Sequence, residues 1–331
     1  MKKILKKFVS PRKRVLIKTL IKTLPERLKA MELDKFYIQT NGKLLYELRR
    51  ATHRLEKSLT FEIRKVGGGI NITQEILELL KLNEKRNFID NFTLNWTKSV
   101  LIQQSNRLKK DITEFQIKDK KRIINSINKI ETIINNNKTN SIIEQPKLYN
   151  ISSINNKDLL HFFSTRHSVR SFKPVKIESE KIYLAVEIAK LTPTPCNKQS
   201  VKVSIIQDTD IIIKVLKLQG GIVGYEEQIF NLAVISTTRE AYPGFYEKHS
   251  VFTEGALFGM NFIWGLHSQN ISTVVLNWIG NFKKTKKLND VLNLNKYYQP
   301  VFMVAFGYFK ENVMIPTSPR QTTESFINIV S

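Results

Sequence analysis

Cysteine is almost absent from this chain of 331 residues, with Cys196 as its single representative. One cysteine cannot form an intramolecular disulfide, and it cannot supply a multi-cysteine metal site. Nothing in the cysteine usage therefore requires an oxidising compartment. A cytoplasmic location fits the sequence best, and we expect no bound metal ion.

Long hydrophobic runs are also missing. The longest apolar stretches, such as residues 301–309, fall far short of the roughly 20 residues that a helix needs to cross a bilayer. Residues 1–24 mix basic and apolar side chains without an unbroken apolar segment or a small-residue cleavage site, which disfavours a signal peptide. The sequence predicts no membrane-spanning segment, although a hydrophobic content of 41% is enough for a core.

Acidic residues are outnumbered by basic residues, 29 to 53, which gives a net charge of +24. Residues 1–150 carry 33 basic and 15 acidic side chains, so 33 − 15 = +18 lies in the first half and 24 − 18 = +6 in the remainder. Such asymmetry indicates an anionic partner for the first half, and residues 1–30 are candidates for peripheral contact with an anionic membrane face. A nucleic-acid partner is disfavoured, because no reading motif and few interleaved aromatics are present. A drift toward lysine, asparagine and isoleucine codons in an AT-rich genome explains the charge equally well.

Glycine and proline are scarce in the first half after Pro25, and apolar residues recur there at helical steps of three, four or seven. The resulting stripe contains Leu101, Leu108, Ile112 and Phe115, followed by Ile123, Ile127, Ile130 and Ile134. A polar stretch from Asn135 to about Asn156 is typical of a linker. We therefore predict a basic helical region over residues 1–150 and a second domain over residues 151–331.

The second half mixes the two periodicities. Residues 178–191 and 253–268 have helical patterns, whereas strand patterns occupy residues 201–207, 232–237, 272–278 and 300–308. This order predicts an α+β or α/β domain.

The most informative run is residues 166–172. Within five residues it offers two guanidinium groups, an imidazole and a hydroxyl, from Arg166, His167, Ser168 and Arg170. These are good donors for a phosphate dianion, with each charge-assisted hydrogen bond contributing on the order of 1.5–3 kcal/mol. By residue type alone, a solvated basic loop is the simpler interpretation.

The same run resembles the opening motif of the nitroreductase family, which grips the FMN phosphate and ribityl chain. One helix later, residues 191–199 resemble the family's Pro-Ser-x-x-Asn-x-Gln segment, which lies against the flavin. Thr194 takes the serine place after Pro193, and Asn197 and Gln199 match. A proline-rich turn in which the asparagine merely caps a loop is the alternative for this segment.

Two further elements follow in the family's order. Glu254 and Gly255 are similar to an element whose backbone amides approach flavin N5 and O4, although a helix packing through small residues is an alternative interpretation. Residues 265–276 resemble a helix end and strand that the family often writes with Gly-Leu-Gly, and Arg320 stands where many members present a basic residue to the phosphate. The implied cofactor-binding residues are Arg166, His167, Ser168, Arg170, Thr194, Pro195, Asn197, Gln199, Glu254, Gly255, Thr273 and Arg320.

The resemblance covers about residues 157–325 and includes departures from the family pattern. Ser200 and Val201 replace a frequent Pro-Trp pair, and Ser318 replaces a frequent lysine. It implies a nitroreductase-like fold, with a mixed, mainly antiparallel sheet flanked by helices and preceded by the helical region. It also implies a homodimer with FMN at the subunit interface and a ping-pong transfer of hydride from NAD(P)H, through the flavin, to an acceptor. No acid/base side chain is needed for this chemistry.

In the basic half, residues 53–59 resemble an element of longer nitroreductase-like proteins associated with bacterial surface polysaccharide loci. His53 and Glu56 within it are better explained by a helical ion pair than by a metal site. Asp208 and Asp210 imitate a metal-binding Asp-x-Asp pair, but this pattern is common in turns.

A second hypothesis stays open for the whole chain. In it the protein is a catalytically weak flavin-fold scaffold that its basic half holds at an anionic membrane or polymer surface.

Overall fold

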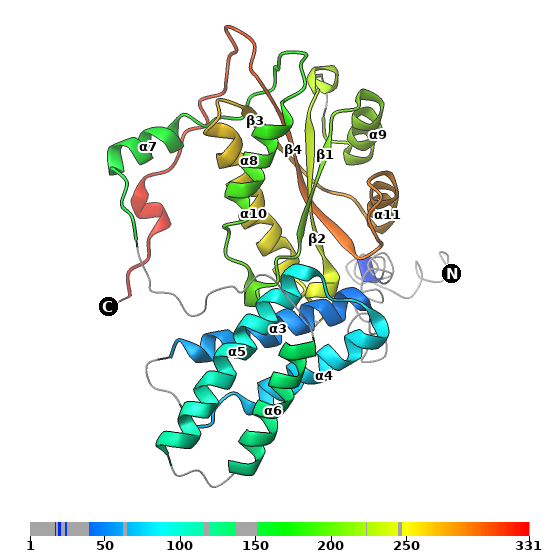
Figure 1. The fold of residues 1–331 in the computed structure, drawn as a ribbon. Coiled ribbons are helices and arrows are strands. Elements are labelled where there is room, and N and C mark those ends of the chain that lie inside the picture. The colour runs from blue at the N-terminus through cyan, green and yellow to red at the C-terminus, as the bar shows by residue number, and fades with distance from the viewer. Residues whose placement is uncertain are drawn as a thin grey trace.

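The structure is a computed structural model that describes residues 40–61, 65–115, 120–136, 151–222, 224–243 and 247–330, with four single positions before residue 40. A group of helices precedes a domain in which helices surround a sheet (Figure 1). The predicted contact of residues 1–30 with a membrane, and most of the predicted linker, lie outside the described residues.

The helical region consists of α3 (Asn41–Leu59), α4 (Ile70–Arg86), α5 (Asn91–Glu114) and α6 (Lys120–Asn136). Thr40 and Asp90 cap α3 and α5, because their side chains accept hydrogen bonds from the amides of Lys43 and Thr93. The apolar faces meet in a common core that contains Leu48, Leu55, Ile76, Trp96, Leu101 and Ile130. The predicted helical character of this region is confirmed.

The predicted apolar stripe is buried along most of its length. Leu101, Leu108, Ile123, Ile127 and Ile130 lie in two adjoining apolar clusters, and Ile112 and Ile134 pack against them. Phe115 does not belong to the stripe. It is the C-cap of α5 with an extended backbone and is 47% exposed, because the helix ends one residue before it.

The second domain contains one four-stranded sheet in the order β1 (Val201–Ile206), β2 (Leu232–Thr238), β4 (Tyr298–Gly307) and β3 (Ser272–Asn277). Each neighbouring pair of these strands is antiparallel. Among the residues that the structure describes, the parallel pairing is an isolated bridge between Ser168 and Thr273. All four predicted strands are confirmed, and β1 and β3 form the two edges.

Helices cover both faces of the sheet (Figure 1). On one face, α8 (Ser179–Ala189) and α10 (Ser250–His267) pack against Ala233, Ile235, Val304 and Phe306. On the other face, α9 (Thr209–Gln219) and α11 (Phe282–Val291) pack against the alternate residues of the same strands, such as Val234 and Met303. The predicted α+β architecture is confirmed, although α9 and α11 were not predicted from sequence.

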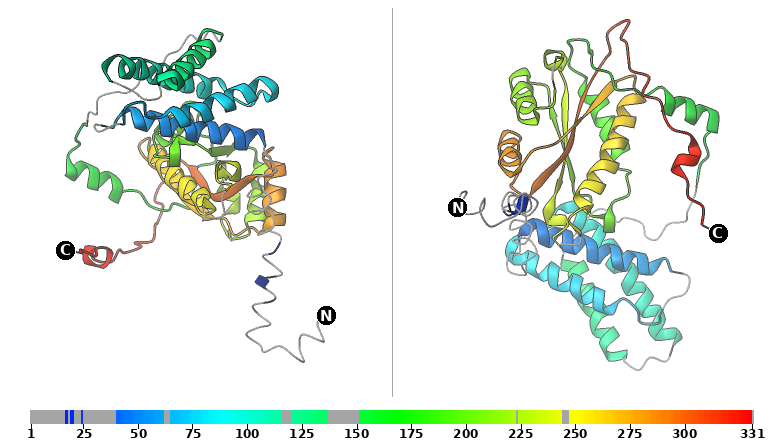
Figure 2. Two further views of the ribbon diagram at one scale, coloured as in Figure 1. Left: turned by 90° about the horizontal axis from the view of Figure 1, so that it is seen from below. Right: turned by 180° about the vertical axis from the view of Figure 1, so that it is seen from behind.

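Shorter elements connect the layers and the helical region. α7 (Asn156–Ser164) contacts α10 through Phe162 and Phe163, whose rings pack on Trp264. The short helices are η1 (Pro195–Asn197), η2 (Glu226–Gln228), η3 (Arg239–Ala241) and η5 (Thr323–Phe326). Within the described helical region, α3 packs on η1 and η3. This helix, drawn in blue, lies against the sheet domain (Figure 2). In the described parts of the chain, no helix combines the length and apolar character that crossing a membrane requires.

The α8–α10 contact depends on a glycine. A Cβ built on Gly265 would lie 2.7 Å from the Cα of Ala185 and 3.0 Å from its carbonyl oxygen, so backbone and not a flexible side chain would have to move. We expect Gly265→Ala to lower the free energy of unfolding by about 1–3 kcal/mol through overpacking. Urea unfolding measures the change, with Lys286→Ala on the exposed face of α11 as the control. Equal stability of the two variants would contradict this account of the contact.

Candidate functional site

The segment that carries the first motif is fixed along the β3 edge of the sheet. Ser168 bridges Thr273 in parallel, and the amide of Val169 donates to the carbonyl oxygen of Thr273 at 3.0 Å. Phe172 then pairs with Phe309, just beyond β4. These backbone contacts place Arg166 and His167 beside the start of β3.

A concavity of about 210 Å³ opens at this position and is called the basic pocket here. Three predicted cofactor residues, Arg166, His167 and Thr273, line it together with His267 from the end of α10. Its remaining lining residues are Thr165, Val169, Asn270, Ser272, Phe309, Val313 and Ile315. No carboxylate is among the residues that line this pocket, so its polar side chains are one guanidinium group, two imidazoles, hydroxyls and the Asn270 amide.

Electrostatic interactions show that cations gather here. Burial lowers the pKa of Arg166, and the guanidinium group of Arg320, far along the chain, lowers it further. Burial also lowers the pKa of His267 from its ordinary value. A hydrogen bond to the Phe162 carbonyl opposes that shift, whereas the charges of Arg166 and His167 add to it. A bound anion would relieve this mutual repulsion.

The other predicted phosphate ligands are placed less directly. Arg170 is exposed, and its Nη1 donates to the Ser168 carbonyl at 3.3 Å, so the side chain folds back on its own segment. Arg320 is also exposed and donates to the Ser318 carbonyl at 2.8 Å, but it is near enough to Arg166 to shift the pKa of that residue. Arg320 therefore interacts electrostatically with Arg166, although neither Arg320 nor Arg170 lines the basic pocket.

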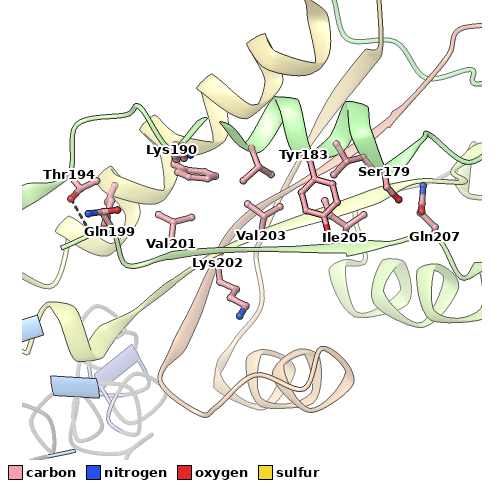
Figure 3. A pocket seen from close by; sticks show the side chains of 14 residues that line it. Ser179, Tyr183, Lys190, Thr194, Gln199, Val201, Lys202, Val203, Ile205 and Gln207 are labelled. Carbon is pink, nitrogen blue, oxygen red and sulfur yellow. Dashed lines mark hydrogen bonds between the residues drawn. The ribbon is translucent and has the colours of Figure 1, made fainter. Parts of the chain in front are cut away.

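A second group of predicted residues lines a larger groove of about 530 Å³ between α8, β1 and α10, called the edge groove here (Figure 3). Thr194 and Gln199 lie at one end of it (Figure 3), and Glu254 is also among its lining residues. The Thr194 hydroxyl accepts a hydrogen bond from the Gln199 amide at 3.0 Å. Val201 and Val203 point from β1 toward α8, so the floor of the groove is apolar (Figure 3).

The loop of residues 194–199, which contains η1, has an unusual backbone. Cys196, Asn197 and Gln199 have φ angles of 54°, 51° and 50°. These angles lie in the left-handed region, which residues other than glycine rarely adopt. Such residues cost on the order of 1 kcal/mol or more each and persist where their surroundings hold them. Nε2 of Gln199 also donates a hydrogen bond to the side-chain oxygen Oδ1 of Asn197 at 3.0 Å, which links two of the predicted residues.

Glu254 occupies a buried polar cluster behind this loop. Its carboxylate is 0% exposed and accepts hydrogen bonds from the Ser200 amide at 2.9 Å, from the Ser200 hydroxyl and from the Tyr242 hydroxyl at 2.6 Å. Burial and the neighbouring carboxylate raise the pKa of Tyr242 well above its ordinary value. A proline at position 200, as is frequent in the family that the sequence resembles, has no amide hydrogen to donate. The presence of Ser200 is therefore coupled to Glu254.

Glu254 and Gly255 are the fifth and sixth residues of α10, so their amides fall within the regular helical hydrogen bonding. A Cβ on Gly255 would lie 2.5 Å from Cγ2 of Val301, which gives this glycine a packing role between α10 and β4. The prediction that these two amides face a flavin ring stays a prediction.

The two groups of predicted residues do not meet within one chain. Glu254 marks the edge groove and His267 marks the basic pocket at opposite ends of α10, and 13 residues of helix span about 20 Å. The groups also lie along opposite edges of the sheet, β3 for the pocket and β1 for the groove. A single chain thus presents two separate halves of the predicted site.

Sequence reasoning missed several residues that hold the loop. Lys198 is only 2% exposed, and its Nζ lies 3.5 Å from a Glu247 carboxylate oxygen and 4.3 Å from the centre of the Tyr242 ring. Burial lowers the pKa of Lys198, whereas Glu247 raises it. Arg49 of α3 reaches the Lys198 carbonyl oxygen at 2.8 Å. No motif signals these contacts, because they join segments that are distant in sequence.

Two other sequence interpretations are confirmed. His53 Nδ1 lies 2.9 Å from a Glu56 carboxylate oxygen, and the Trp96 indole donates to the other oxygen at 3.0 Å, as expected for a helical ion pair in packing. Asp208 is the N-cap of α9 and accepts from the Ile211 amide at 2.9 Å, which agrees with a turn. Across the described ranges, no group of three or more histidine, cysteine or acidic side chains is arranged to hold a metal ion.

The lowered pKa of His267 predicts a pH effect on stability. Above about pH 6.5 the residue is neutral in both the folded and unfolded chain. Below that, the unfolded chain takes up a proton that the folded pocket resists, so stability falls as the pH falls. We expect the free energy of unfolding of the wild type to decrease between about pH 7.5 and 5.5.

Part of this decrease should be missing in His267→Gln, as measured by urea unfolding at each pH. His161→Gln removes an exposed histidine on α7 and serves as the control. Superimposable pH profiles for the wild type and His267→Gln would refute the assignment.

Comparison with known proteins agrees with this geometry. A family model described as Nitroreductase family matches residues 163–249, which include the first motif, the 194–199 loop and β2. No curated protein matches the chain.

Several solved structures are similar in part. The NfrA1 nitroreductase of B. subtilis is 17% identical, with 51% of this chain and 72% of that chain covered and a TM-score of 0.46. NfrA2 of B. megaterium is 16% identical, with 52% of this chain and 74% of that chain covered and a TM-score of 0.46. An FMN-dependent nitroreductase of Clostridium difficile is 16% identical, with 47% of this chain and 91% of that chain covered and a TM-score of 0.41. The match to the nitroreductase family model is the finding that concerns family, and it covers residues 163–249.

Proposed function

We propose that this chain is an FMN-dependent oxidoreductase that takes hydride from NAD(P)H and reduces a small-molecule acceptor. The observation that carries the proposal is the basic pocket, where Arg166 and His167 line one concavity with Thr273, more than 100 positions further along the sequence, 273 − 167 = 106. The charge of Arg320 also acts on Arg166 and lowers its pKa. The family match over residues 163–249 supports a flavin as the ligand.

The donor set of the basic pocket fits the phosphate end of FMN. Arg166 and His167 provide charged or polar hydrogens, and Thr273 adds a hydroxyl. Arg320, whose charge lowers the pKa of Arg166, is proposed to reach the phosphate from the C-terminal segment. Charge-assisted hydrogen bonds to a phosphate are about twice as strong as neutral ones. Ser168 and Arg170 follow on the same segment and are proposed to contact the phosphate or ribityl chain at the rim.

The 194–199 loop is proposed to contact the ring system. Thr194, Pro195, Asn197 and Gln199 lie in this loop, in which Asn197 and Gln199 have left-handed backbones and hydrogen bonds link Gln199 to Thr194 and Asn197, so the donors and acceptors of the loop are fixed before any ligand binds. Bound FMN would supply the redox chemistry, accepting hydride and releasing electrons to a second substrate in a ping-pong sequence. The protein's residues orient the cofactor and exclude water, and no side chain need transfer a proton.

A homodimer is proposed because one chain holds only the two separated halves. In a two-fold symmetric pair, each surface patch contacts the other patch of the partner, so the basic pocket of one chain can face the 194–199 loop of the other. Large apolar side chains are exposed on the two helices that cover one face of the sheet, among them Leu184 of α8 and Leu257 of α10. The C-terminal segment leaves Met314, Phe326 and Ile329 exposed as well. A partner chain would cover such surface.

A second candidate function is a weakly active flavin-fold scaffold that its basic half holds at an anionic membrane or polymer surface. The charge of +18 over residues 1–150 favours it. We infer a cytoplasmic location for either function, with contact at the inner membrane face in the second, and a role in surface polysaccharide synthesis from the 53–59 resemblance. Co-sedimentation of the full chain and of one lacking residues 1–30 with anionic liposomes separates the two functions, and equal binding by both chains would exclude the anchor.

The cofactor assignment makes a quantitative prediction. Arg166→Gln and Arg320→Gln should each weaken FMN binding about 10- to 100-fold, because each removes a charge-assisted hydrogen bond of about 1.5–3 kcal/mol. Quenching of flavin fluorescence on titration of the purified protein measures the affinity. Lys283→Gln, an exposed cation on α11, is the matched control for loss of one positive charge.

Wild-type protein should also be yellow and should oxidise NAD(P)H. A colourless protein that does not bind added FMN, or one whose affinity drops equally in all three variants, would contradict the proposed site.

A further inference from the structure

We propose that Arg49 of the helical region is a positioning residue that holds the 194–199 loop in its ligand-ready conformation. The inference rests on the proposed function, because that function assigns the loop to the flavin ring. It makes the helical region part of the cofactor site although none of its side chains lines the basic pocket or the edge groove.

Each nitrogen of the Arg49 guanidinium group donates one hydrogen bond at 2.8 Å. Nη1 donates to the Lys198 carbonyl oxygen, Nη2 to the Asp90 carboxylate and Nε to the Thr93 hydroxyl. Arg49 is only 9% exposed, so these bonds form largely out of water. Asp90 and Thr93 belong to the start of α5, and the guanidinium group therefore bridges the core of the helical region to the loop.

The Lys198 carbonyl lies in the part of the loop where left-handed residues stand on both sides. Lys198 itself has an ordinary helical backbone, but Asn197 before it and Gln199 after it are both left-handed. The bonds within the loop anchor its amides: Asn197 donates to the Thr194 carbonyl, Lys198 to the Pro195 carbonyl and Gln199 to the Thr194 hydroxyl. Among the hydrogen bonds of the described residues, Arg49 is the donor to the Lys198 carbonyl. A charged donor strengthens that bond.

The charges around the contact are balanced. Asp90 neutralises the guanidinium group at 2.8 Å, and Glu247 faces the buried ammonium group of Lys198. Lys198 also lies over the Tyr242 ring, which belongs to the Glu254 cluster. The loop is thus held by two sets of contacts: Glu247 and Tyr242 of its own domain contact the Lys198 side chain, and Arg49 of the helical region binds the Lys198 carbonyl.

A second contact fixes the orientation of α3 relative to the sheet domain, so that the Arg49 side chain is held next to the 194–199 loop. At the start of α3, the Thr40 hydroxyl donates to the carboxylate of Glu240 in η3. A Cβ built on Gly42 would lie 2.4 Å from a Glu240 carboxylate oxygen, so the helix approaches η3 closely. α3 is therefore docked at η3 by its first turn and at η1 by Arg49, two turns further on.

Cys196 provides a probe that does not depend on flavin. It is the only cysteine of the chain, it lies inside the loop and it is partly exposed. The rate at which Ellman's reagent modifies it in the full-length protein without FMN therefore reports a change in the conformation of the loop. We expect Arg49→Met to react about 10-fold faster than wild type, because a charge-assisted bond to the loop is lost. FMN binding should weaken by a similar factor.

Arg54→Met is the matched control. Arg54 lies on the same helix and pairs with Glu75 of α4 at 3.1 Å, without contact to the loop. This variant should react at the wild-type rate. Arg49→Lys keeps the charge but can donate to fewer of the three acceptors, so an intermediate rate is expected, and it replaces Arg49→Met if that variant does not fold.

An unchanged Cys196 rate in a folded Arg49 variant would overturn the proposal. An equal acceleration in Arg54→Met would overturn it as well, because the effect would then come from general loosening of α3. If Cys196 reacts faster in the Arg49 variants but the wild type binds no FMN, the positioning role stands and the proposed function fails.

Discussion

The length of α10 is the constraint on which the arrangement of the site depends. The helix runs across one face of the sheet, with the Glu254 cluster near its first turns and His267 at its last turn, about 20 Å apart. Close packing against α8 and the sheet, through Gly255 and Gly265, leaves no freedom to bring the two ends together. Cationic donors at one end and the polar loop at the other are therefore separate within one chain. Any ligand that uses both must lie where two chains meet, which is why the cofactor proposal and the dimer proposal stand or fall together.

The helical region is tied to this scheme by specific polar contacts. Arg49 and Thr40 reach loop and helix segments that follow them by 149 and 200 positions. Contacts of this kind fix orientation more than they add stability, because each buried polar group must find its partner to avoid a desolvation cost. The buried Lys198, the Glu254 cluster and the Arg49 bridge form one continuous polar layer between the sheet domain and α3.

The fold was predictable from sequence wherever periodicity was strong. The four strands and helices α8 and α10 were found because their apolar residues alternate or recur at helical steps. α9 was not predicted, although Ile211, Ile212, Val215 and Leu216 recur at helical steps. In α11, four lysines leave few apolar residues to set a pattern. Phe115 was misplaced because periodicity does not mark where a helix ends.

The site was predictable only as a set of segments. The residue types of the first motif identified donors for an anion, and the structure gathers Arg166, His167 and Thr273 while leaving Arg170 at the surface. Spacing in the sequence could not reveal that Thr194 and Gln199 line a different cavity, since that depends on the strand order β1-β2-β4-β3. Arg49, Lys198 and Tyr242 carry no local signature, because their roles arise only from contacts across the tertiary structure.

Co-expression of two defective chains tests the central claim most directly. One chain carries Arg166→Gln with Arg320→Gln, and the other carries Asn197→Gly with Gln199→Gly, so that each retains one half of the site. If both halves come from different chains, half of the randomly paired dimers have one intact site, and the mixture should bind about one quarter of the FMN that wild type binds, although neither variant alone binds it. A mixture that binds no more FMN than its components, or a wild-type monomer that binds FMN fully, would contradict the account.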